Sequence, residues 1–181
     1  MKIRPTDLPG VVVVEPRVFG DARGSFFETF RRNVLEEALG RSLDFVQDNH
    51  STSVRGVLRG LHYQLPHPQA KLVRVVRGEV FDVAVDLRRA SPGFGRWVGE
   101  TLSAENRLQL FLPEGVAHGF LALSAEAELL YKATDYYHPE AERCVRWDDP
   151  DLAIAWPLSG APPILSAKDA AGAPFRAATP S

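Results

Sequence analysis

Short segments in which apolar and polar side chains alternate with a period of two constrain the fold of this chain most strongly. In segment 80–87 four large apolar residues occupy the odd positions, while Asp82 and Asp86 lie on the opposite face, as in a β-strand. Further strands are expected at 11–14, 26–30, 57–63, 71–77, 97–102, 108–112, 119–123 and 129–134. The 14 glycines and 14 prolines separate these segments at short intervals, which predicts an all-β sandwich or closed barrel.

Helices have a minor place in this prediction. Segment 31–39 contains good helix formers and is followed by Gly40, so a helix is expected to end there. A short C-terminal helix is expected near Asp169. The length of 181 residues fits a single domain, 1–181, with a flexible tail after about residue 175.

Composition excludes several functional classes. The chain has 21 Lys and Arg against 23 Asp and Glu, so no overall basic field attracts nucleic acid or an anionic membrane. The single cysteine, Cys144, makes no internal disulfide and rules out a cysteine-rich zinc site. The segment 1–10 has no apolar core of a signal peptide, so a cytoplasmic protein is expected.

Two histidines on predicted strands, His62 and His118, raise the question of a metal site. Pro113, Gly115 and His118 match the P-x-G-x-x-H motif by which cupin barrels supply a late metal ligand. The early H-x-H pair of those barrels is missing after His62, and a transition-metal site usually needs three protein ligands. These residues predict a cupin-like barrel without its metal; alternatively, both histidines are hydrogen-bonded core residues.

Three cations are candidates for binding an anion. Arg23, Arg59 and Lys71 lie in or beside predicted strands, and Arg23 precedes Gly24, where a ligand can approach the backbone. Arginine suits bidentate phosphate contacts and lysine suits a single oxyanion, although each residue taken alone is better explained as a surface charge.

Two further side chains have chemistry that suits an active site. Asp169 is a candidate to hydrogen-bond a histidine ring and fix its tautomer, or simply to cap the C-terminal helix. Tyr131 is either a core residue or a proton donor at the mouth of the barrel. Spacing alone does not choose between these interpretations.

Taken together, the segments resemble one family, the dTDP-4-dehydrorhamnose 3,5-epimerases. The resemblance extends from about Val11 to Asp169, and the order and spacing of its motifs are far more specific than any single motif. The motifs are 19–24 (FGDARG), 27–28 (FE), 45–51 (FVQDNHS), 58–64 (LRGLHYQ), 71–74 (KLVR), 78–86 (GEVFDVAVD), 113–120 (PEGVAHGF), 131–134 (YKAT) and 166–169 (SAKD).

The resemblance implies a fold and a reaction. The expected fold is an all-β, cupin-like jelly-roll barrel with a few short helices, in a homodimer whose N-terminal segment adds to the partner's sheet. The expected substrate is dTDP-4-dehydro-6-deoxy-D-glucose, and inversion at C3 and C5 gives dTDP-4-dehydro-L-rhamnose on the route to a deoxysugar. No metal or organic cofactor is expected.

The resemblance also implies roles by position. His62 is the expected base and Asp169 its orienting partner, with Tyr131 as the acid on the opposite face and Lys71 stabilising the oxygen at C4. Arg23, Arg59 and Lys168 are expected to contact the diphosphate; Glu28, Gln47 and Asn49 to contact the nucleotide or sugar hydroxyls; and His118 and Glu142 to complete the pocket.

Other interpretations stay open at this point. A relative that inverts only C3 or only C5 differs in pocket geometry alone. A cupin that binds a nucleotide-sugar without catalysis, a metal-dependent oxygenase and a 3,4-ketoisomerase are weaker alternatives. The loop 65–70, with an exposed His67, and Cys144 receive no role.

Overall fold

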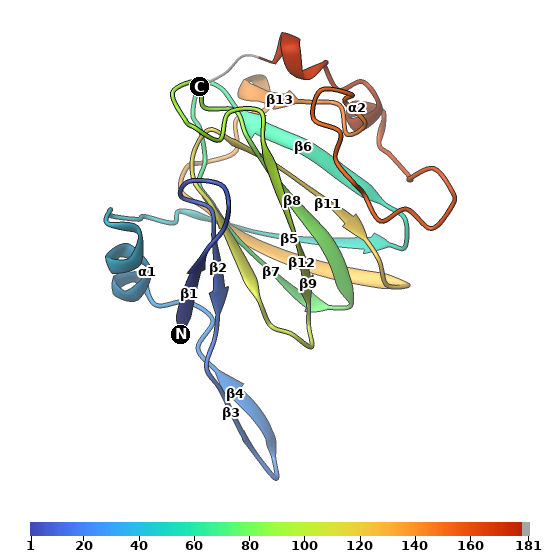
Figure 1. Ribbon diagram of the computed structural model, residues 1–181. Helices are drawn as coiled ribbons and strands as arrows, with labels where there is room; N and C mark the ends of the chain where they lie inside the picture. The colour runs from blue at the N-terminus through green and yellow to red at the C-terminus, as the bar shows by residue number, and fades with distance from the viewer. Residues whose placement is uncertain (179–181) are drawn as a thin grey trace.

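Two antiparallel sheets face each other in the computed structural model, which describes residues 1–178 (Figure 1). The larger sheet has the order β1 (Lys2–Pro5), β2 (Val12–Glu15), β10 (Gln109–Leu112), β7 (Lys71–Arg77), β12 (Glu126–Ala133), β5 (Gln47–Val54). The smaller sheet has the order β13 (Glu142–Cys144), β6 (Leu58–Gln64), β11 (Val116–Ala122), β8 (Glu79–Asp86), β9 (Trp97–Ser103). The expected all-β barrel with a few short helices is confirmed.

Apolar side chains from both sheets fill one end of the barrel. Val73 and Leu129 of the larger sheet and Val80 and Phe120 of the smaller sheet belong to this buried cluster. A second cluster lies on the outer face of the smaller sheet, where the segment after β13 covers it. The smaller sheet is therefore buried on both faces, and this is why Asp82 and Asp86, opposite the apolar face of β8, are also fully buried.

The predicted strands agree with the structure where apolar alternation is strong. Segment 71–77 matches β7, and 97–102 lies within β9, whereas β11 begins three residues before the expected segment 119–123. The strand expected at 26–30 instead spans 24–27. Four strands had no counterpart in the prediction: β1, β3 (Val18–Asp21), β5 and β13. Strands β1, β3 and β13 are short, and the side chains of β5 are mostly polar.

The helix expected before Gly40 is α1 (Arg32–Leu39). It buries Leu35 against the outer face of the larger sheet, together with Leu43 and Phe111. Gly40 has φ of 65° and its N–H donates to Glu36 O, so the left-handed conformation that ends the helix favours glycine there.

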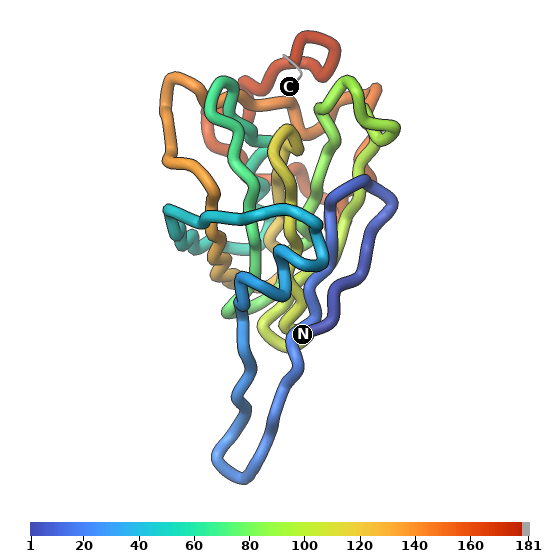
Figure 2. Tube along the Cα trace, turned by 90° about the vertical axis from the view of Figure 1, so that its left-hand side faces the viewer, coloured from blue at the N-terminus to red at the C-terminus, as the bar shows by residue number. Residues whose placement is uncertain are grey.

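A two-stranded hairpin, β3 (Val18–Asp21) and β4 (Gly24–Phe27), projects away from the barrel (Figures 1 and 2). Phe19 and Phe26 on this hairpin are 52% and 73% exposed. An isolated hairpin is marginally stable in water, and these two rings give this one an exposed apolar surface.

Three short helical turns complete the chain: η1 (Pro139–Ala141), α2 (Ala167–Ala170) and η2 (Phe175–Ala177). Phe175 packs on Phe94, and its N–H donates to Asp149, so the part of the expected tail that the structure describes begins with a 3₁₀ turn. Residues 179–181 of that tail lie outside the described residues. Among residues 1–178, no helix has the length and apolar character needed to cross a membrane.

Candidate active site

The inward-facing side of β5 is polar along its whole length. On β5 the less exposed face consists of Gln47, Asn49, Ser51 and Ser53, whereas the intervening residues are exposed. Four inward polar side chains in a row do not form a hydrophobic core, and they give this wall of the barrel a polar inner surface.

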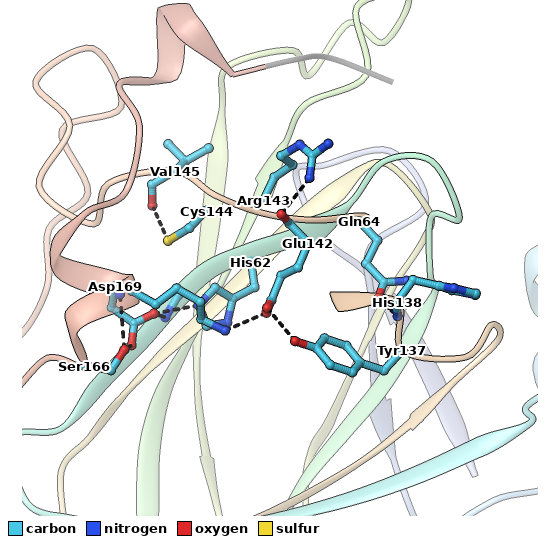
Figure 3. A network of polar contacts seen from close by, with 12 residues as sticks. His62, Gln64, Tyr137, His138, Glu142, Arg143, Cys144, Val145, Ser166 and Asp169 are labelled. Atoms are coloured by element: carbon cyan, nitrogen blue, oxygen red, sulfur yellow. Dashed lines mark hydrogen bonds and ion pairs between the residues drawn. The ribbon is translucent and has the colours of Figure 1, made fainter. Parts of the chain in front are cut away.

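His62, on β6, is held by Asp169 of α2 (Figure 3). Its Nε2 and Asp169 Oδ1 are 2.6 Å apart, and Asp169 also accepts hydrogen bonds from the Gly60 N–H and the Ser166 hydroxyl. Burial raises the pKa of Asp169, but these hydrogen bonds outweigh it and lower the pKa to about 2. The ionised carboxylate accepts a hydrogen bond from the His62 Nε2–H. In this tautomer the free lone pair of the His62 ring lies on Nδ1.

Gly60 makes the position of His62 possible. A Cβ at residue 60 would lie 2.6 Å from Gly119 Cα and from His118 O, so only glycine lets β6 approach β11 this closely. Gly60 also has φ of 118°, a conformation that L side chains rarely adopt.

A second histidine–carboxylate pair lies beside the first. His118 stands directly opposite His62 in the β11–β6 pairing, and its Nε2 is 2.9 Å from Asp82 Oδ2. Asp82 is fully buried on β8. Sequence reasoning did not select Asp82, although its place opposite the apolar face of a predicted strand was a usable signal.

Lys71 and Tyr131 come from the larger sheet, which forms the other wall of the barrel. The Lys71 Nζ lies 5.6 Å from the centroid of the Tyr131 ring. Burial lowers the pKa of Lys71 to about 8, although the nearby carboxylates of Glu142 and Asp82 oppose this shift. Burial also raises the pKa of Tyr131, so its phenol keeps its proton near neutral pH.

Glu142 connects the two walls at the mouth of the barrel. Its carboxylate accepts hydrogen bonds from Lys168 Nζ at 2.7 Å and from the Tyr137 hydroxyl at 2.8 Å (Figure 3). Burial raises the pKa of Glu142, but these two hydrogen bonds outweigh it and lower the pKa. Tyr137 was missed by sequence reasoning because it lies in a loop without strand periodicity.

Two inward polar atoms lack partners among the described residues. Asn49 Nδ2 and Ser51 Oγ are buried and make no hydrogen bond, while Asn49 Oδ1 accepts from Gln47 Nε2 at 2.9 Å. An unpaired buried polar group costs about 1–3 kcal/mol, so a ligand that pairs with these atoms gains that amount.

The predicted anion-binding residues divide into two groups. Arg59 is exposed, and its guanidinium donates hydrogen bonds to Ser53 Oγ and Thr52 O. It therefore bridges the two sheets beside the polar inner face of β5. Arg23 pairs with Asp21 at the tip of the projecting hairpin, and Glu28 pairs with Arg31 beside it. Arg59 and Lys168 therefore contact residues of the barrel site, whereas Arg23 and Glu28 lie on or next to the hairpin, which projects away from the barrel (Figure 2).

Two groups of three side chains among the described residues have the spacing for a metal ion. His62, Cys144 and Asp169 form one group, with Cys144 directly opposite His62 in the β13–β6 pairing. Burial raises the pKa of the Cys144 thiol to about 11, so the thiol is protonated near neutral pH. His67, Asp135 and His138 form the second group, outside the barrel.

The arrangement provides the parts of a proton-transfer site. A histidine held by an ionised aspartate can take up a proton, a protonated tyrosine on the other wall can donate one, and a lysine can stabilise a developing oxyanion. A jelly-roll barrel with these groups inside belongs to the class of cupin-type enzymes that move protons on a small polar substrate.

Comparison with known proteins identifies the family. The family model described as dTDP-4-dehydrorhamnose 3,5-epimerase matches residues 5–177, and the chain belongs to this family. The dTDP-4-dehydrorhamnose 3,5-epimerase of Pseudomonas aeruginosa is 60% identical over 97% of this chain and 96% of its own length. The family expected from the sequence is confirmed.

Two solved structures extend the comparison. The dTDP-6-deoxy-D-glucose-3,5-epimerase of Legionella pneumophila, in complex with dTDP-4-keto-L-rhamnose, has a TM-score of 0.94 and 53% identity, covering 97% of this chain and 93% of that one. A 4-keto-6-deoxy sugar epimerase from the novobiocin biosynthetic gene cluster of Streptomyces spheroides has a TM-score of 0.93 and 43% identity, covering 97% of this chain and 88% of that one.

Proposed function

We propose that this protein inverts C3 and C5 of dTDP-4-dehydro-6-deoxy-D-glucose to give dTDP-4-dehydro-L-rhamnose. The observation that carries the proposal is the His62–Asp169 pair on one wall of the barrel, opposite Tyr131 and Lys71 on the other, in a chain of this family. The reaction moves protons only and leaves the oxidation state unchanged, so side chains alone supply its chemistry.

His62 is the base in this proposal. The C4 ketone acidifies the protons on C3 and C5, and neutral His62 removes one of them to give an enolate. Asp169 orients the ring and stabilises the imidazolium that forms, because it stays ionised with a pKa of about 2.

Tyr131 and Lys71 act from the other wall. Inversion requires that the new proton arrive on the face opposite the base, and Tyr131 keeps a proton to donate because burial raises its pKa. The ammonium of Lys71 stabilises the enolate oxygen at C4, and below its pKa of about 8 it carries the charge this requires.

The remaining polar groups bind the substrate. Arg59 and Lys168 are cations at the cavity and contact the diphosphate. The unpaired Asn49 amide bonds to the nucleotide or a sugar hydroxyl beside Gln47. His118 and Glu142 complete the pocket around the sugar, as the sequence predicts.

We also infer a homodimer in which the β3–β4 hairpin reaches the partner. The hairpin exposes Phe19 and Phe26, carries Arg23 at its tip, and projects away from the barrel of its own chain (Figure 2). Docking of the hairpin on the second subunit buries both rings and brings Arg23 and Glu28 to the partner's diphosphate and nucleotide sites.

Proton exchange in D₂O tests the reaction directly. Incubation with dTDP-4-dehydro-6-deoxy-D-glucose should remove the C3 and C5 proton signals from the NMR spectrum, and coupling to a 4-ketoreductase should confirm the L-configured product. His62→Asn should stop exchange, while His50→Asn, a matched change at an exposed histidine, should not. Exchange at one centre only would indicate a single-centre epimerase, and no exchange would leave a nucleotide-sugar-binding protein.

A further inference from the structure

We propose that His67, Asp135 and His138 bind one divalent transition-metal ion, such as Zn²⁺, and that the ion links two loops beside the active site. The site is distinct from the residues proposed for catalysis. His67 belongs to the loop 65–70 between β6 and β7, and the other two residues belong to the loop after β12.

The three side chains already have the spacing of metal ligands. The rings of His67 and His138 stack with centroids 4.1 Å apart and an interplanar angle of 19°. His67 Nδ1 is 3.5 Å from Asp135 Oδ2, and one ligand atom of each residue lies within 4.8 Å of the others. Tetrahedral ligands at about 2.0–2.1 Å from zinc are about 3.3–3.4 Å apart, so the site closes when one imidazole turns out of the stack and both nitrogen lone pairs point at the ion.

The ligand types point to a transition metal. Two imidazoles and one carboxylate suit Zn²⁺ and its neighbours in the first row, whereas Mg²⁺ and Ca²⁺ prefer sites made of oxygen alone. The His67 and Asp135 side chains are 50% and 36% exposed, so water can complete the coordination. Glu140 Oε1, 3.5 Å from His138 Nδ1, adds a second carboxylate at the edge of the site.

A buried amide holds the two loops in place before any ion binds. Gln64 is 6% exposed; its Nε2 donates to the backbone oxygens of His67 and Tyr136, and its Oε1 accepts from the His138 N–H. Gln69 Nε2 donates to Asp135 O at 2.7 Å. This network orders the backbone of every proposed ligand, so binding costs little conformational entropy.

The position of the site gives it a structural consequence. Tyr137 lies next to His138 in the same loop, and its hydroxyl bonds to Glu142 while its N–H bonds to Gln47 at 2.9 Å. Figure 3 shows His138 beyond Tyr137 and Gln64, on the side away from His62. An ion that joins this loop to loop 65–70 therefore restrains Tyr137 without touching the catalytic pair.

Calorimetric titration of the untagged chain, stripped with a chelator, with Zn²⁺ tests the site. The wild-type chain should bind one equivalent, and His67→Ala and His138→Ala should each weaken binding at least about 100-fold. His50→Ala is the matched control, because His50 is an exposed histidine that pairs with the carboxylate of Glu128, 3.1 Å away. It should leave the affinity unchanged.

Two further measurements distinguish this site from its alternative. Cys144→Ser should not change the affinity; a loss in that variant, with none in His67→Ala or His138→Ala, would place the ion at the catalytic pair and overturn the proposal. Zn²⁺ should slow amide hydrogen exchange in 65–70 and 134–141 of the wild-type chain but not of His138→Ala. Equal binding by wild type and the two histidine variants would also overturn it.

Discussion

Asp169→Asn gives the sharpest test of the proposed activation of His62 by Asp169. The change keeps the size of the side chain and a carbonyl oxygen for the Gly60 N–H, so the fold should persist. It removes the negative charge that accepts the His62 Nε2 proton at 2.6 Å and stabilises the imidazolium. The amide also competes to donate to the ring, which favours the wrong tautomer.

The size of the effect follows from this geometry. Because charge is delocalised over the ring and the carboxylate, the effective separation is about 4 Å, and two unit charges at that distance attract by about 4 kcal/mol at an effective dielectric constant of 20. Loss of that attraction in the transition state lowers kcat about 1,000-fold, since about 1.4 kcal/mol corresponds to a factor of ten.

The assay is loss of the substrate C3 and C5 proton signals in D₂O, at saturating substrate and with the fold checked by circular dichroism. Asp148→Asn is the matched control, because Asp148 pairs with Arg146 on the surface at 2.7 Å and should leave kcat unchanged. A folded Asp169→Asn variant whose kcat stays within tenfold of the wild type would refute the role of the pair.

Four other outcomes are expected. Tyr131→Phe should lower inversion at one centre or both by about 100-fold or more while isotope exchange at C3 or C5 continues, and unchanged product stereochemistry would exclude Tyr131 as the acid. Activity should fall as pH rises through about 8, where Lys71 loses its charge, and Lys71→Arg should remove that fall from the pH profile. Folding lowers the pKa of Asp169 from 3.8 to about 2, so the ionised carboxylate stabilises the folded state by about 2 kcal/mol above pH 4, and this contribution is lost as pH falls toward 2. Urea unfolding between pH 7 and pH 2 should show this loss in the wild type and not in Asp169→Asn. Phe26→Ser should convert the protein to monomers, which light scattering measures. Mixing the Arg23→Ala chain with the His62→Ala chain should restore activity only if the hairpin of one subunit completes the site of the other.

Several strands and the end of one helix could be predicted from the sequence. The period-two pattern predicted β7 and β8, because a strand with one buried face needs apolar residues at every second position. Gly40 marked the end of α1, because a residue in left-handed conformation favours glycine. Strand β5 was not recognised, because its inward face is polar as well as its exposed face and its side chains do not alternate in polarity. A strand whose inward side chains are polar lacks the apolar alternation by which a core strand is recognised.

The functional residues divide in the same way. The sequence marked His62, Tyr131, Lys71 and Asp169 as candidates through motif order, but each alone had an ordinary structural explanation. Their chemistry depends on distances between residues that are far apart in the chain, such as the 107 positions that separate His62 from Asp169. Only the folded barrel brings these groups within hydrogen-bond reach.

What the sequence determined by itself is the family, the barrel and the set of candidate side chains, since these follow from local periodicity and from motifs in a fixed order. The tertiary structure decided which of them act on one another. It paired Asp82 with His118, lowered the pKa of Lys71 by enclosing it, and kept Arg23 away from His62 in its own chain. Electrostatics and burial arise from the packing of distant segments, and local sequence carries no direct record of that packing.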